Sequence, residues 1–491
     1  MLGKIIEIRD EKVRVKMSID IKLQPSLSNL HVVFEEEGKK IVGEITSINE
    51  EYLDIVIIGE IVGNRYLPGV QKKPSFKAEV RIINMDELIL ILGPSTPSPT
   101  TFYLGESSIY NNYGINVGIN NFFSNHFAII GNSGSGKSCA TATILQNLFY
   151  SNNPPVNSNI FVFDTYGEYH HSFSRLSDVN PRITYKSITT NPKAKEVEQL
   201  RIPLWLMGVD GIAMLLDVND PNQIPIIEKT LTLLPVLTRN DESVLRYKNN
   251  IIAKCLRDII LTGKSASNVR NQIISVLTCY NTPELNLDLK IVEPGYTRTL
   301  KQCLYVNDND SMAAIEKVVG AISHFINYVD DRFAKVLVKL LSKALFNQCA
   351  LAEKRASKAF HILIEEAHRY VQNDTDTKLF GYNIFDRIAK EGRKYGILLG
   401  FITQRPSEIS ETAISQCSNF LIFRTMHARD VNYLETMMPN VTKDTINTIK
   451  TLQPGTCMTF GSAFKIPISV KLQMPNPAPL SSNAKIESIW Y

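Results

Sequence analysis

The sequence has few of the features that mark secreted or membrane-inserted proteins. Its seven cysteines are scattered and none forms a C-x-x-C pair. That usage is typical of reduced thiols in a cytosolic protein rather than of a disulfide framework or a zinc site. No run of about 18 apolar residues occurs, and the opening stretch MLGKIIEIRDEKVRV lacks the apolar centre of a signal peptide. We therefore expect a cytoplasmic protein without a membrane-inserted segment.

An excess of charge of one sign is also missing. Lys and Arg together number 53 and Asp and Glu 49, which leaves a formal net charge of +4. This excess is too small to indicate nucleic-acid binding by itself, although a local basic surface is compatible with it. The hydrophobic content of 44% and the charged content of 21% are those of an ordinary globular protein. A chain of 491 residues is long enough for about two to four domains.

Motifs that carry chemistry are equally few, with one exception. The sequence contains no His/Cys metal cluster, no G-x-S-x-G nucleophile motif and no separate nuclease-like set of carboxylates. Any cutting activity would therefore have to come from another polypeptide. The exception is the stretch HFAIIGNSGSGKSCATATILQNLF, residues 126–149.

Residues 131–138 match the phosphate-loop pattern G-x-x-x-x-G-K-[ST], between an apolar strand and an apolar-periodic helix. The glycines let successive backbone N–H groups point at one anion, and the following helix adds the positive end of its dipole. We expect Lys137 to reach the β- and γ-phosphates of ATP and the Ser138 hydroxyl to bind Mg²⁺. The predicted nucleotide-binding residues are Gly131, Asn132, Ser133, Gly134, Ser135, Gly136, Lys137, Ser138 and Cys139, the last as a small helical residue rather than a redox switch.

Residues 1–92 are predicted to form a small β-barrel. Short runs in which apolar and polar positions alternate follow one another, separated by turns and with no helix expected between them. These runs are KIIEI, VRVKM, HVVFEE, KIVGEITSI, YLDIVIIGEIV, KAEVRII and ELILILG. The composition changes at GPSTPSPTT, residues 93–101, which we interpret as a linker.

From Phe102 onward strands alternate with helices, which predicts an α/β fold with buried parallel strands and functional groups at their carboxyl ends. The predicted strands lie in FAIIG, NIFVFDTYGEY, FHILIEEAH, YGILLGFITQ and FLIFRT. The intervening block has helical periodicity, and we therefore expect a helical insertion in an ATPase core. The predicted helices lie at 224–237, 245–261, 268–277 and 332–348. The predicted parts are 102–184 (core), 185–345 (insertion), 346–470 (core) and a Pro-rich tail, 471–491, that could lie across a neighbouring subunit.

Acidic residues follow two of these apolar runs. In FHILIEEAHRY, Glu365 and Glu366 suit the two tasks of ATP hydrolysis, which are to orient the Mg²⁺ shell and to polarise the attacking water. We assign Glu366 as the catalytic base and Glu365 as the carboxylate on the metal side. In NIFVFDTYGEY, either Asp164 or Glu168 could lie near the metal or the water, or could merely cap a helix. We favour Asp164 as the catalytic residue of this pair.

A neutral amide and an arginine complete the candidate site. Gln404, in FITQRP, could hydrogen-bond the γ-phosphate or the water without adding charge, as a sensor residue requires. Arg393, in AKEGRKYG, is predicted on an exposed connection, from which it could reach a neighbouring subunit's nucleotide and stabilise the transition state. Arg424, in FLIFRTMHARD, is the competing candidate, and we favour Arg393.

Together these residues resemble the HerA family of hexameric ATPases, relatives of the FtsK DNA pump. The similar stretches span nearly the whole chain and include VIIGEI, GNSGSGKS, FDTYGEY, LRIPLWLM, IEEAHRY, KEGRKYG, TQRP and PGTCMTFGSAFKIPISV. The resemblance implies a HAS-type N-terminal barrel, a RecA-like P-loop core interrupted by helices, and a six-subunit ring with ATP sites between subunits and duplex DNA in its channel. It also implies phosphate and Mg²⁺ roles for Lys137 and Ser138, catalytic carboxylates at Asp164 and Glu366, and an arginine finger at Arg393.

One position departs from the family pattern. The usual Asp-Glu pair is here Glu365-Glu366, so the first carboxylate is carried about one C–C bond further from the backbone. Because Mg²⁺ demands tight octahedral geometry, this change could lower metal affinity or turnover. Glu366 is unchanged, and we expect hydrolysis to be retained.

Two hypotheses of function follow from the resemblance. In the first, the ring is a motor on double-stranded DNA that works with a partner such as a NurA-type nuclease or an NAD-consuming defence effector. Residues 371–387 could then furnish a pore loop in which Lys378 and Arg387 contact phosphates, or these charges could only solvate a helix face. In the second, the ring is an ATP-binding scaffold that organises and regulates an effector. A conjugation or secretion ATPase is a weaker third reading, because such proteins usually work at a membrane.

Overall fold

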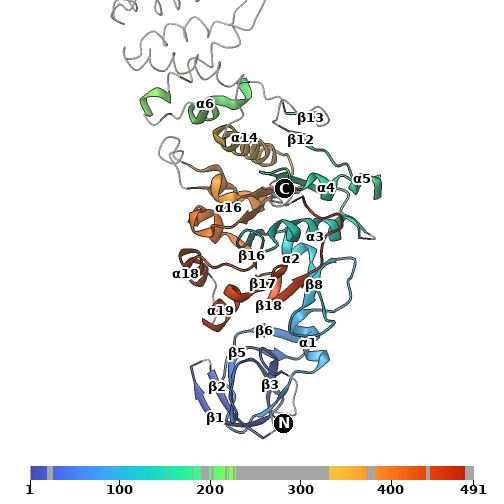
Figure 1. The fold of residues 1–491 in the computed structure, drawn as a ribbon, viewed down its shortest axis with the longest axis vertical. Helices are drawn as coiled ribbons and strands as arrows, with labels where there is room; N and C mark the ends of the chain where they lie inside the picture. The colour runs from blue at the N-terminus through green and yellow to red at the C-terminus, as the bar shows by residue number, and fades with distance from the viewer. Residues whose placement is uncertain are drawn as a thin grey trace, which may run out of the picture. The chain divides into compact units, whose positions relative to one another are not determined.

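The computed structural model describes residues 2–10, 12–18, 26–151, 153–179, 181–189, 198–200, 204–215, 218, 221–224, 227, 331–372, 382–437 and 443–480. The chain divides into two compact units (Figure 1). The first comprises residues 1–186, 344–372 and 384–491, and the second residues 187–343 and 373–383. The predicted helices at 224–237, 245–261 and 268–277 lie almost wholly outside the described residues, so the domain bounds predicted from the sequence remain predictions.

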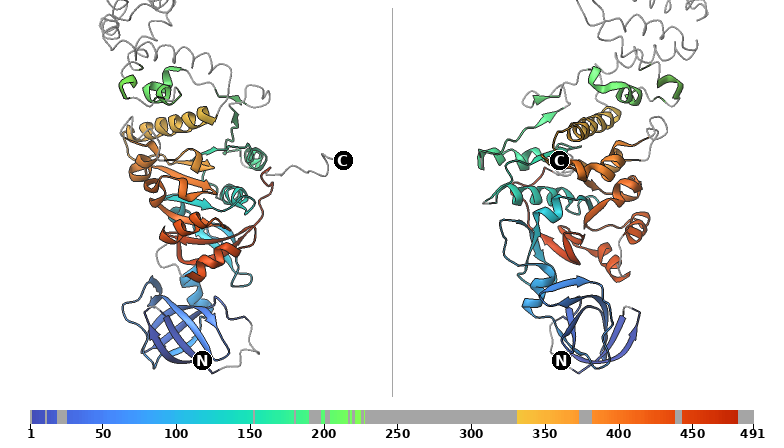
Figure 2. Two further views of the ribbon diagram at one scale, coloured as in Figure 1. Left: turned by 60° about the vertical axis from the view of Figure 1, so that its left-hand side comes forward. Right: turned by 180° about the vertical axis from the view of Figure 1, so that it is seen from behind.

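The N-terminal strands form the expected barrel (Figure 2). Their order is β2-β1-β7-β3-β4-β5-β6, and β2 also pairs with β5, which closes the sheet. All pairings are antiparallel. Alternation decides the two faces, since Val13 and Val15 are fully buried whereas Lys12 and Arg14, which alternate with them, are exposed. The strands are β1 (Gly3–Arg9), β2 (Lys12–Met17), β3 (His31–Glu36), β4 (Lys39–Ile48), β5 (Tyr52–Val62), β6 (Arg65–Pro68) and β7 (Glu79–Ile82).

The strand predicted over ELILILG is wrong, because these residues form helix α1 (Met85–Leu92). The side chain of Asn84 accepts a hydrogen bond from the Glu87 backbone N–H, and the Glu87 side chain accepts one from the Asn84 N–H. This reciprocal capping box starts a helix. Leu88 and Ile91, three residues apart, are both buried on one side of it. The apolar residues therefore line one face of a helix instead of alternating along a strand.

The predicted α/β core contains a mixed nine-stranded sheet of order β11-β14-β15-β10-β16-β17-β18-β8-β9. The strands from β11 to β16 are parallel, as predicted, and those from β16 to β9 are antiparallel. The strands are β8 (Thr101–Ser107), β9 (Gly114–Gly118), β10 (His126–Ile130), β11 (Asn159–Phe163), β14 (Phe360–Glu365), β15 (Ile397–Thr403), β16 (Cys417–Ile422), β17 (Thr456–Gly461) and β18 (Phe464–Leu472).

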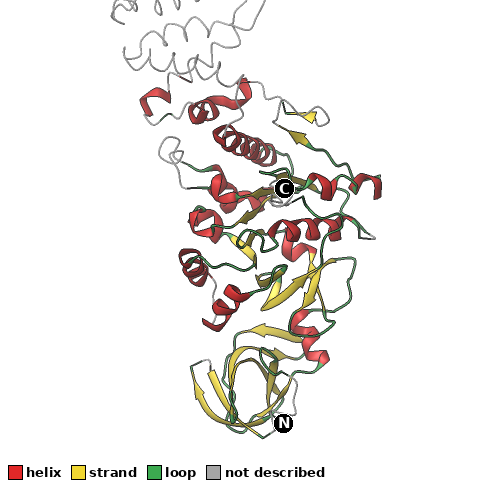
Figure 3. Cartoon of the chain, viewed as in Figure 1, coloured by secondary structure: helices red, strands yellow, loops and turns green. Residues whose placement is uncertain are grey.

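Helices cover both sides of this sheet (Figure 3). Helix α3 (Lys137–Phe149) contacts β8 and β10, and α16 (Ile384–Tyr395) contacts β15 on the other side. Besides α1 and the end of α14, the other helical segments among the described residues of the first unit are α2 (Ile119–Phe123), α4 (His170–Phe173), α5 (Leu176–Val179), η4 (Ala367–Arg369), η5 (Pro406–Glu408), α17 (Glu411–Ser415), α18 (Ala428–Met437) and α19 (Lys443–Thr451). No helix in the described ranges is both long and apolar enough to cross a membrane.

The described part of the second unit is small. It contains β12 (Ile188–Thr189), β13 (Glu198–Gln199), α6 (Leu204–Leu215), η2 (Pro221–Gln223) and the first part of α14 (Asp331–Ala350). Helix α14 confirms the helix predicted from the periodicity of residues 332–348. Met207, Ile212 and Val336 belong to its apolar cluster, and Lys343 forms an ion pair with Asp210.

The described part of the C-terminal tail lies against its own chain. On α3, Gln146 donates through Nε2 to the carbonyl of Pro477 (2.8 Å) and accepts through Oε1 from the N–H of Asn476 (2.9 Å). The N–H of Leu480 donates to the carbonyl of Glu168 (3.0 Å). Residues 473–480 therefore run beside α3 and α4, and residues 481–491 lie outside the described part of the chain.

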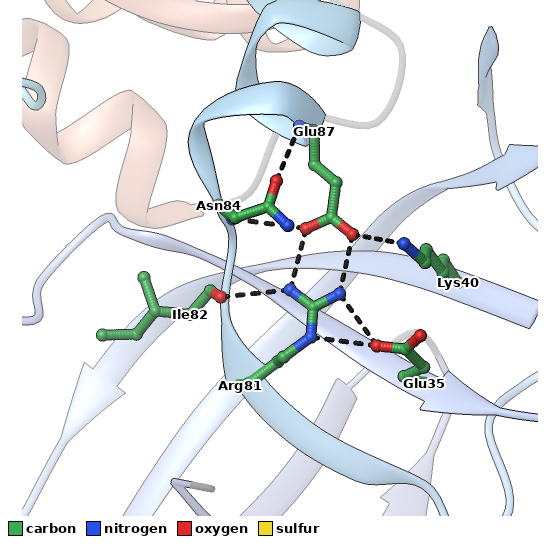
Figure 4. Close-up of polar contacts among 6 residues, drawn as sticks. All are labelled: Glu35, Lys40, Arg81, Ile82, Asn84 and Glu87. Carbon is green, nitrogen blue, oxygen red and sulfur yellow. Dashed lines mark hydrogen bonds and ion pairs between the residues drawn. The ribbon is translucent and has the colours of Figure 1, made fainter. Parts of the chain in front are cut away.

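A charged cluster fastens α1 to the barrel (Figure 4). The guanidinium of Arg81 donates to both carboxylate oxygens of Glu87 (2.8 and 2.7 Å) and to Glu35 (3.0 and 2.8 Å), while Lys40 donates to Glu87 (2.8 Å). Only 4% of Glu87 is exposed. The hydrogen bonds from Arg81 are the main reason that the pKa of Glu87 falls to about 2. Bidentate Arg–carboxylate pairs fix orientation as well as charge, so the cluster sets how α1 leaves the barrel.

Replacing Glu87 by Gln tests the cluster, since Gln can keep the capping box but not the charge. The pKa of Glu87 lies below its ordinary value of 4.5, so its stabilisation is present above about pH 4.5 and is lost as the pH falls towards 2. We expect Glu87→Gln to lower the free energy of unfolding of the barrel by about 2 kcal/mol at neutral pH. The difference should shrink below about pH 4, as measured by thermal denaturation over a pH series.

Asp54→Asn is the matched control. Asp54 pairs with Arg14 on the barrel surface at 2.8 Å, but both side chains are substantially exposed, at 32% and 45%. Such pairs contribute roughly 0–1 kcal/mol. Equal losses in the two variants would show that the Glu87 cluster does not hold the junction.

Candidate active site

The carboxyl ends of the parallel strands place all but one of the predicted site residues at one edge of the sheet. The phosphate loop follows β10, Glu365 ends β14, and Gln404 follows β15 directly. Asp164 follows β11 and Arg424 lies two residues beyond β16. Parallel pairing therefore brings together residues that are up to about 290 positions apart in the sequence. Arg393 is the exception.

The phosphate loop has the conformation that its glycines require. Gly134 and Gly136 have φ of +71° and +115°, a region that other residues rarely adopt. A Cβ on Gly131 would lie 2.5 Å from the Cβ of Phe423 and 2.6 Å from the Ser135 hydroxyl oxygen. Helix α3 begins at Lys137, so its first N–H groups have no carbonyl partner within the helix and are available to an anion.

Neighbouring strands hold this loop from outside. The N–H of Gly131 donates to the carbonyl of Thr403 (3.1 Å), and the N–H of Asn132 donates to the carbonyl of Arg424 (2.9 Å). The N–H of Gly455, in the turn before β17, donates to the carbonyl of Ser135 (2.9 Å). Burial lowers the pKa of Lys137, against the opposing effect of Glu366 and Glu365, and its ammonium donates to the carbonyl of Asn132 (3.1 Å).

Glu365 lies beside Ser138, the residue predicted to bind Mg²⁺. The Ser138 hydroxyl donates to its Oε1 at 3.5 Å and the Tyr169 hydroxyl at 3.4 Å, while its buried Oε2 has no hydrogen-bond partner. Burial, followed by the charges of Asp164, Glu168 and Glu366, raises the pKa of Glu365 to about 8. A serine hydroxyl, one carboxylate and an unsatisfied oxygen fit Mg²⁺, which usually takes one or two protein carboxylates together with phosphates and water.

Protein ligands alone do not form a complete metal cage here. In the described ranges, no group of three or more His, Cys, Asp or Glu side chains is arranged to hold a metal ion. A metal at Ser138 and Glu365 would therefore depend on the phosphates of the nucleotide, as is usual for Mg²⁺ in ATPase sites.

Asp164, the first of the two acidic residues after β11, already has hydrogen-bond partners in its own loop. The Asp164 carboxylate accepts hydrogen bonds from the N–H groups of Gly167 (2.8 Å), Glu168 (3.1 Å) and Tyr169 (2.9 Å). The carboxylate thus caps the turn before α4 rather than α4 itself, whose N-cap residue, Tyr169, makes no side-chain capping hydrogen bond. Asp164 thereby fixes the loop that carries Tyr169, and its assignment as a catalytic residue stays a prediction.

Glu366 has a strained backbone and a side chain with two neighbours. Its φ of +47° and ψ of +46° lie in the left-handed region, which costs a residue other than glycine about 1–2 kcal/mol. The Gln404 amide nitrogen lies 3.3 Å from each of its carboxylate oxygens, and Nδ1 of His368 lies 3.3 Å from Oε2. Strain of this kind often accompanies a functional side chain that must point in one direction.

The basic candidates lie in different places. The expectation that Arg393 lies on a connection is wrong, because it is in the last turn of α16, where it is exposed. Burial lowers the pKa of His126 to about 4, and the charge of Arg393 adds to this effect. His126 begins β10 whereas the phosphate loop follows its end, so Arg393 lies at the opposite edge of the sheet, about 15 Å from its own loop.

Three other basic residues were also singled out. Arg424 is beside the phosphate loop of its own chain, and its buried Nε has no hydrogen-bond partner. The guanidinium of Arg387 packs 4.9 Å from the ring centroid of Phe346 and pairs with Glu391 at 3.6 Å. Lys378 lies outside the described residues. Arg387 is thus engaged on the surface of α16, which is the plainer of the two roles expected for it.

Three residues that contact the site were not found from the sequence. Tyr169 reaches Glu365, His368 reaches Glu366, and Gly455 supports the phosphate loop. A weak signal existed for two of them, since His368 follows the carboxylates by two positions and Gly455 lies in a Pro-Gly turn. Tyr169 gave none, because an aromatic residue after a strand is usually part of the core.

The phosphate loop, the carboxylates and the parallel sheet define a P-loop nucleotide-binding protein with a RecA-like core. The family model described as "Helicase HerA, central domain" matches residues 102–352. The chain belongs to this family, which confirms the resemblance seen in its motifs.

Relatives that are similar over most of the chain agree with this assignment at low sequence identity. The DNA double-strand break repair helicase HerA of Sulfolobus acidocaldarius is 25% identical over 94% of this chain and 91% of the relative. The protein of the same name from Pyrococcus furiosus is 23% identical over 92% of this chain and 82% of the relative. The plasmid coupling protein TrwB in complex with an ATP analogue has 11% identity and a TM-score of 0.46, over 80% of this chain and 93% of that chain.

Because the pKa of Glu365 is raised, ionisation of its carboxyl should destabilise the folded protein. The pKa lies above its ordinary value of 4.5, so the contribution of Glu365 to the free energy of unfolding is fully present below about pH 4.5 and is lost as the pH rises through about 8. Glu365→Gln, which stays neutral, should therefore raise the melting temperature of the nucleotide-free protein by about 2–4 °C at pH 8. The gain should disappear towards pH 5.

The exposed Glu353 provides the comparison, since Glu353→Gln should change the melting temperature little at either pH. A gain for Glu365→Gln that is the same at pH 5 and pH 8 would contradict a titrating, buried carboxyl.

Proposed function

We propose that this protein is an ATP-hydrolysing ring motor that moves on or unwinds double-stranded DNA. The observation that carries the proposal is the convergence of the phosphate loop, Glu366 and Gln404 at one edge of the sheet. Membership of the HerA family and the DNA-repair helicases among its relatives support it. In this proposal the protein works as a homo-oligomer, as a hexamer according to the family pattern.

Each residue has one task in the proposed reaction. The loop N–H groups and Lys137 bind the phosphates of ATP, and Ser138 and Glu365 would hold the Mg²⁺, which neutralises phosphate charge when bound. Glu366 accepts a proton from the attacking water, and Gln404 reports the γ-phosphate through its amide. Asp164 acts next to Glu365 by holding the loop of Tyr169.

Arg393 is proposed to act in trans. It cannot reach its own nucleotide from the far edge of the sheet, but an exposed arginine in a helix end is available to a neighbouring subunit. In a ring with head-to-tail interfaces, one face of each subunit meets the opposite face of the next. A cation supplied in this way would stabilise the transition state and would make hydrolysis depend on assembly.

Mixed rings test the trans role. Pure Arg393→Ala and pure Glu366→Gln proteins should each lose ATP turnover by about 100-fold or more. In a 1:1 mixture, a site with Glu366 from the first variant and Arg393 from the second is complete, so about a quarter of the sites should recover. Steady-state phosphate release measures this recovery.

The control is Lys394→Ala, an exposed cation beside Arg393 on the same helix, which should keep near-parental turnover. Subunit exchange is checked with labelled protein. Exchange without any recovery of turnover would rule out a finger supplied by the neighbour.

Double-stranded DNA is the proposed track, and a nuclease or an NAD-consuming effector is the proposed partner. No separate cutting motif was found in the sequence, so a cutting or NAD-consuming activity would belong to that partner. The near-neutral net charge of +4 implies that DNA contacts come from a local basic surface inside the ring.

Duplex DNA should bind the assembled protein at low salt and raise its ATPase rate several-fold, and both effects should weaken as salt increases. Titrations of ATPase rate against duplex DNA at about 50 and 200 mM salt measure this. Lys137→Ala should keep DNA binding but lose the stimulated rate. An assembled ring that neither binds nor responds to DNA would remove the motor proposal.

The alternative function is an ATP-binding scaffold that organises and regulates an effector with little translocation. The observation in its favour is Glu365, which is longer than the usual aspartate and has a pKa of about 8, so that it resists ionisation before nucleotide binds. Slow hydrolysis without DNA stimulation, with Lys137→Ala still assembling with the effector but altering its regulation, would favour the scaffold.

A further inference from the structure

The Glu366 carboxylate has two unlike neighbours. The single amide nitrogen of Gln404 lies 3.3 Å from both carboxylate oxygens. Nδ1 of His368, in η4, lies 3.3 Å from Oε2. Glu366 is 8% exposed and the His368 side chain 12%, so water competes little for these contacts.

His368 is itself fixed by strand β15. Its Nδ1 lies 3.1 Å from the Thr403 hydroxyl oxygen, which also accepts the N–H of Arg405 (3.0 Å). Thr403 is fully buried, and its carbonyl accepts the N–H of Gly131, the first residue of the phosphate loop. A continuous chain of contacts thus runs from the phosphate loop through Thr403 and His368 to Glu366.

The position of the imidazole proton follows from these neighbours. Burial lowers the pKa of His368, although Glu366 opposes the effect, so the neutral ring carries one proton. A ring protonated at Nε2 would turn the lone pair of Nδ1 towards a carboxylate oxygen 3.3 Å away, which is repulsive. We therefore assign the proton to Nδ1, which lies 3.1 Å from the Thr403 hydroxyl oxygen and 3.3 Å from Oε2 of Glu366.

Gln404 and His368 cannot both keep their contacts with the Glu366 carboxylate during the proposed hydrolysis. If Gln404 turns its amide to the γ-phosphate, as the proposed function requires, it withdraws from the carboxylate. Glu366 would then depend on its left-handed backbone and on His368 alone. A general base must stay within hydrogen-bond reach of the attacking water, so a free carboxylate would lose efficiency.

We propose that His368 is a positioning residue that keeps the Glu366 carboxylate aimed at the attacking water while Gln404 contacts the γ-phosphate. This inference rests on the proposed ATPase function and adds a role for a residue outside the phosphate loop, carboxylates, sensor and finger. Because Thr403 contacts both His368 and Gly131, the position of the Glu366 carboxylate is also linked to the position of the phosphate loop.

The test is a comparison of His368→Ala with His368→Asn. The amide nitrogen of Asn can take the place of Nδ1, whereas Ala offers no donor. We expect His368→Ala to lower kcat about tenfold and to change KM for ATP less than about twofold. His368→Asn should recover most of the lost kcat. An unchanged kcat in His368→Ala, or an equal loss in His368→Asn, would overturn the proposal.

His427→Ala is the matched control. Nδ1 of His427 also lies 3.3 Å from a carboxylate oxygen, that of Asp430, but its side chain is 71% exposed and makes no contact with Glu366. The kcat of His427→Ala should equal that of the parent protein. A loss as large as that of His368→Ala would mean that any histidine at this edge matters, which would also count against the proposal.

A second measurement does not depend on turnover. In the nucleotide-free protein, the losses in melting temperature from His368→Ala and Glu366→Ala should not add in the double variant, because both remove one contact. Additive losses would overturn the contact on which the proposal rests. Absence of ATP turnover in the parent protein would instead refute the proposed function, and the double-variant result would still decide on His368.

Discussion

Parallel pairing of β14, β15 and β10 is the constraint on which the site depends. Ile130 lies opposite Thr403, and Glu365 lies opposite Ile402, so the three strands end level with one another. The residues that follow, Gly131 and Glu366 among them, therefore emerge at one edge, where the N-terminus of α3 also points. A shift of one residue in this register would send every buried side chain to the other face and would separate the base from the loop.

The site keeps groups in states that a folded protein ordinarily avoids. Burial raises the pKa of Glu365 to about 8, and Glu366 has a left-handed backbone. Both features cost stability in the nucleotide-free protein, and the proposed function would use both when a nucleotide and a cation bind. Tyr169, in the loop after β11, contacts Glu365, and His368, in η4, contacts Glu366 and is itself in contact with Thr403 of β15.

The barrel and the sheet belong to one packed unit, and α1 is the element that joins them. Arg81 and Lys40 hold Glu87 on its polar side, while Leu88 and Ile91 belong to an apolar cluster that also contains barrel and sheet residues. His31 of β3 contacts the hydroxyl of Tyr110, which lies beyond β8, at 2.6 Å. A partner that contacts the barrel would therefore contact a part of the same compact unit as the sheet.

The sequence by itself determined the local features of this protein. The phosphate loop, the barrel strands, the alternation of buried strands and helices, and the acidic and amide residues at strand ends all depend on spacing within a few residues. The tertiary structure decided what depends on distant neighbours. It showed that ELILILG is a helix, that Arg393 lies across the sheet from its own loop, and that Asp164 caps a turn. It also brought Tyr169 and His368 to the two glutamates. Burial and strand register create those contacts, and no local pattern encodes them, because each side chain acts through partners that only the folded sheet brings within reach.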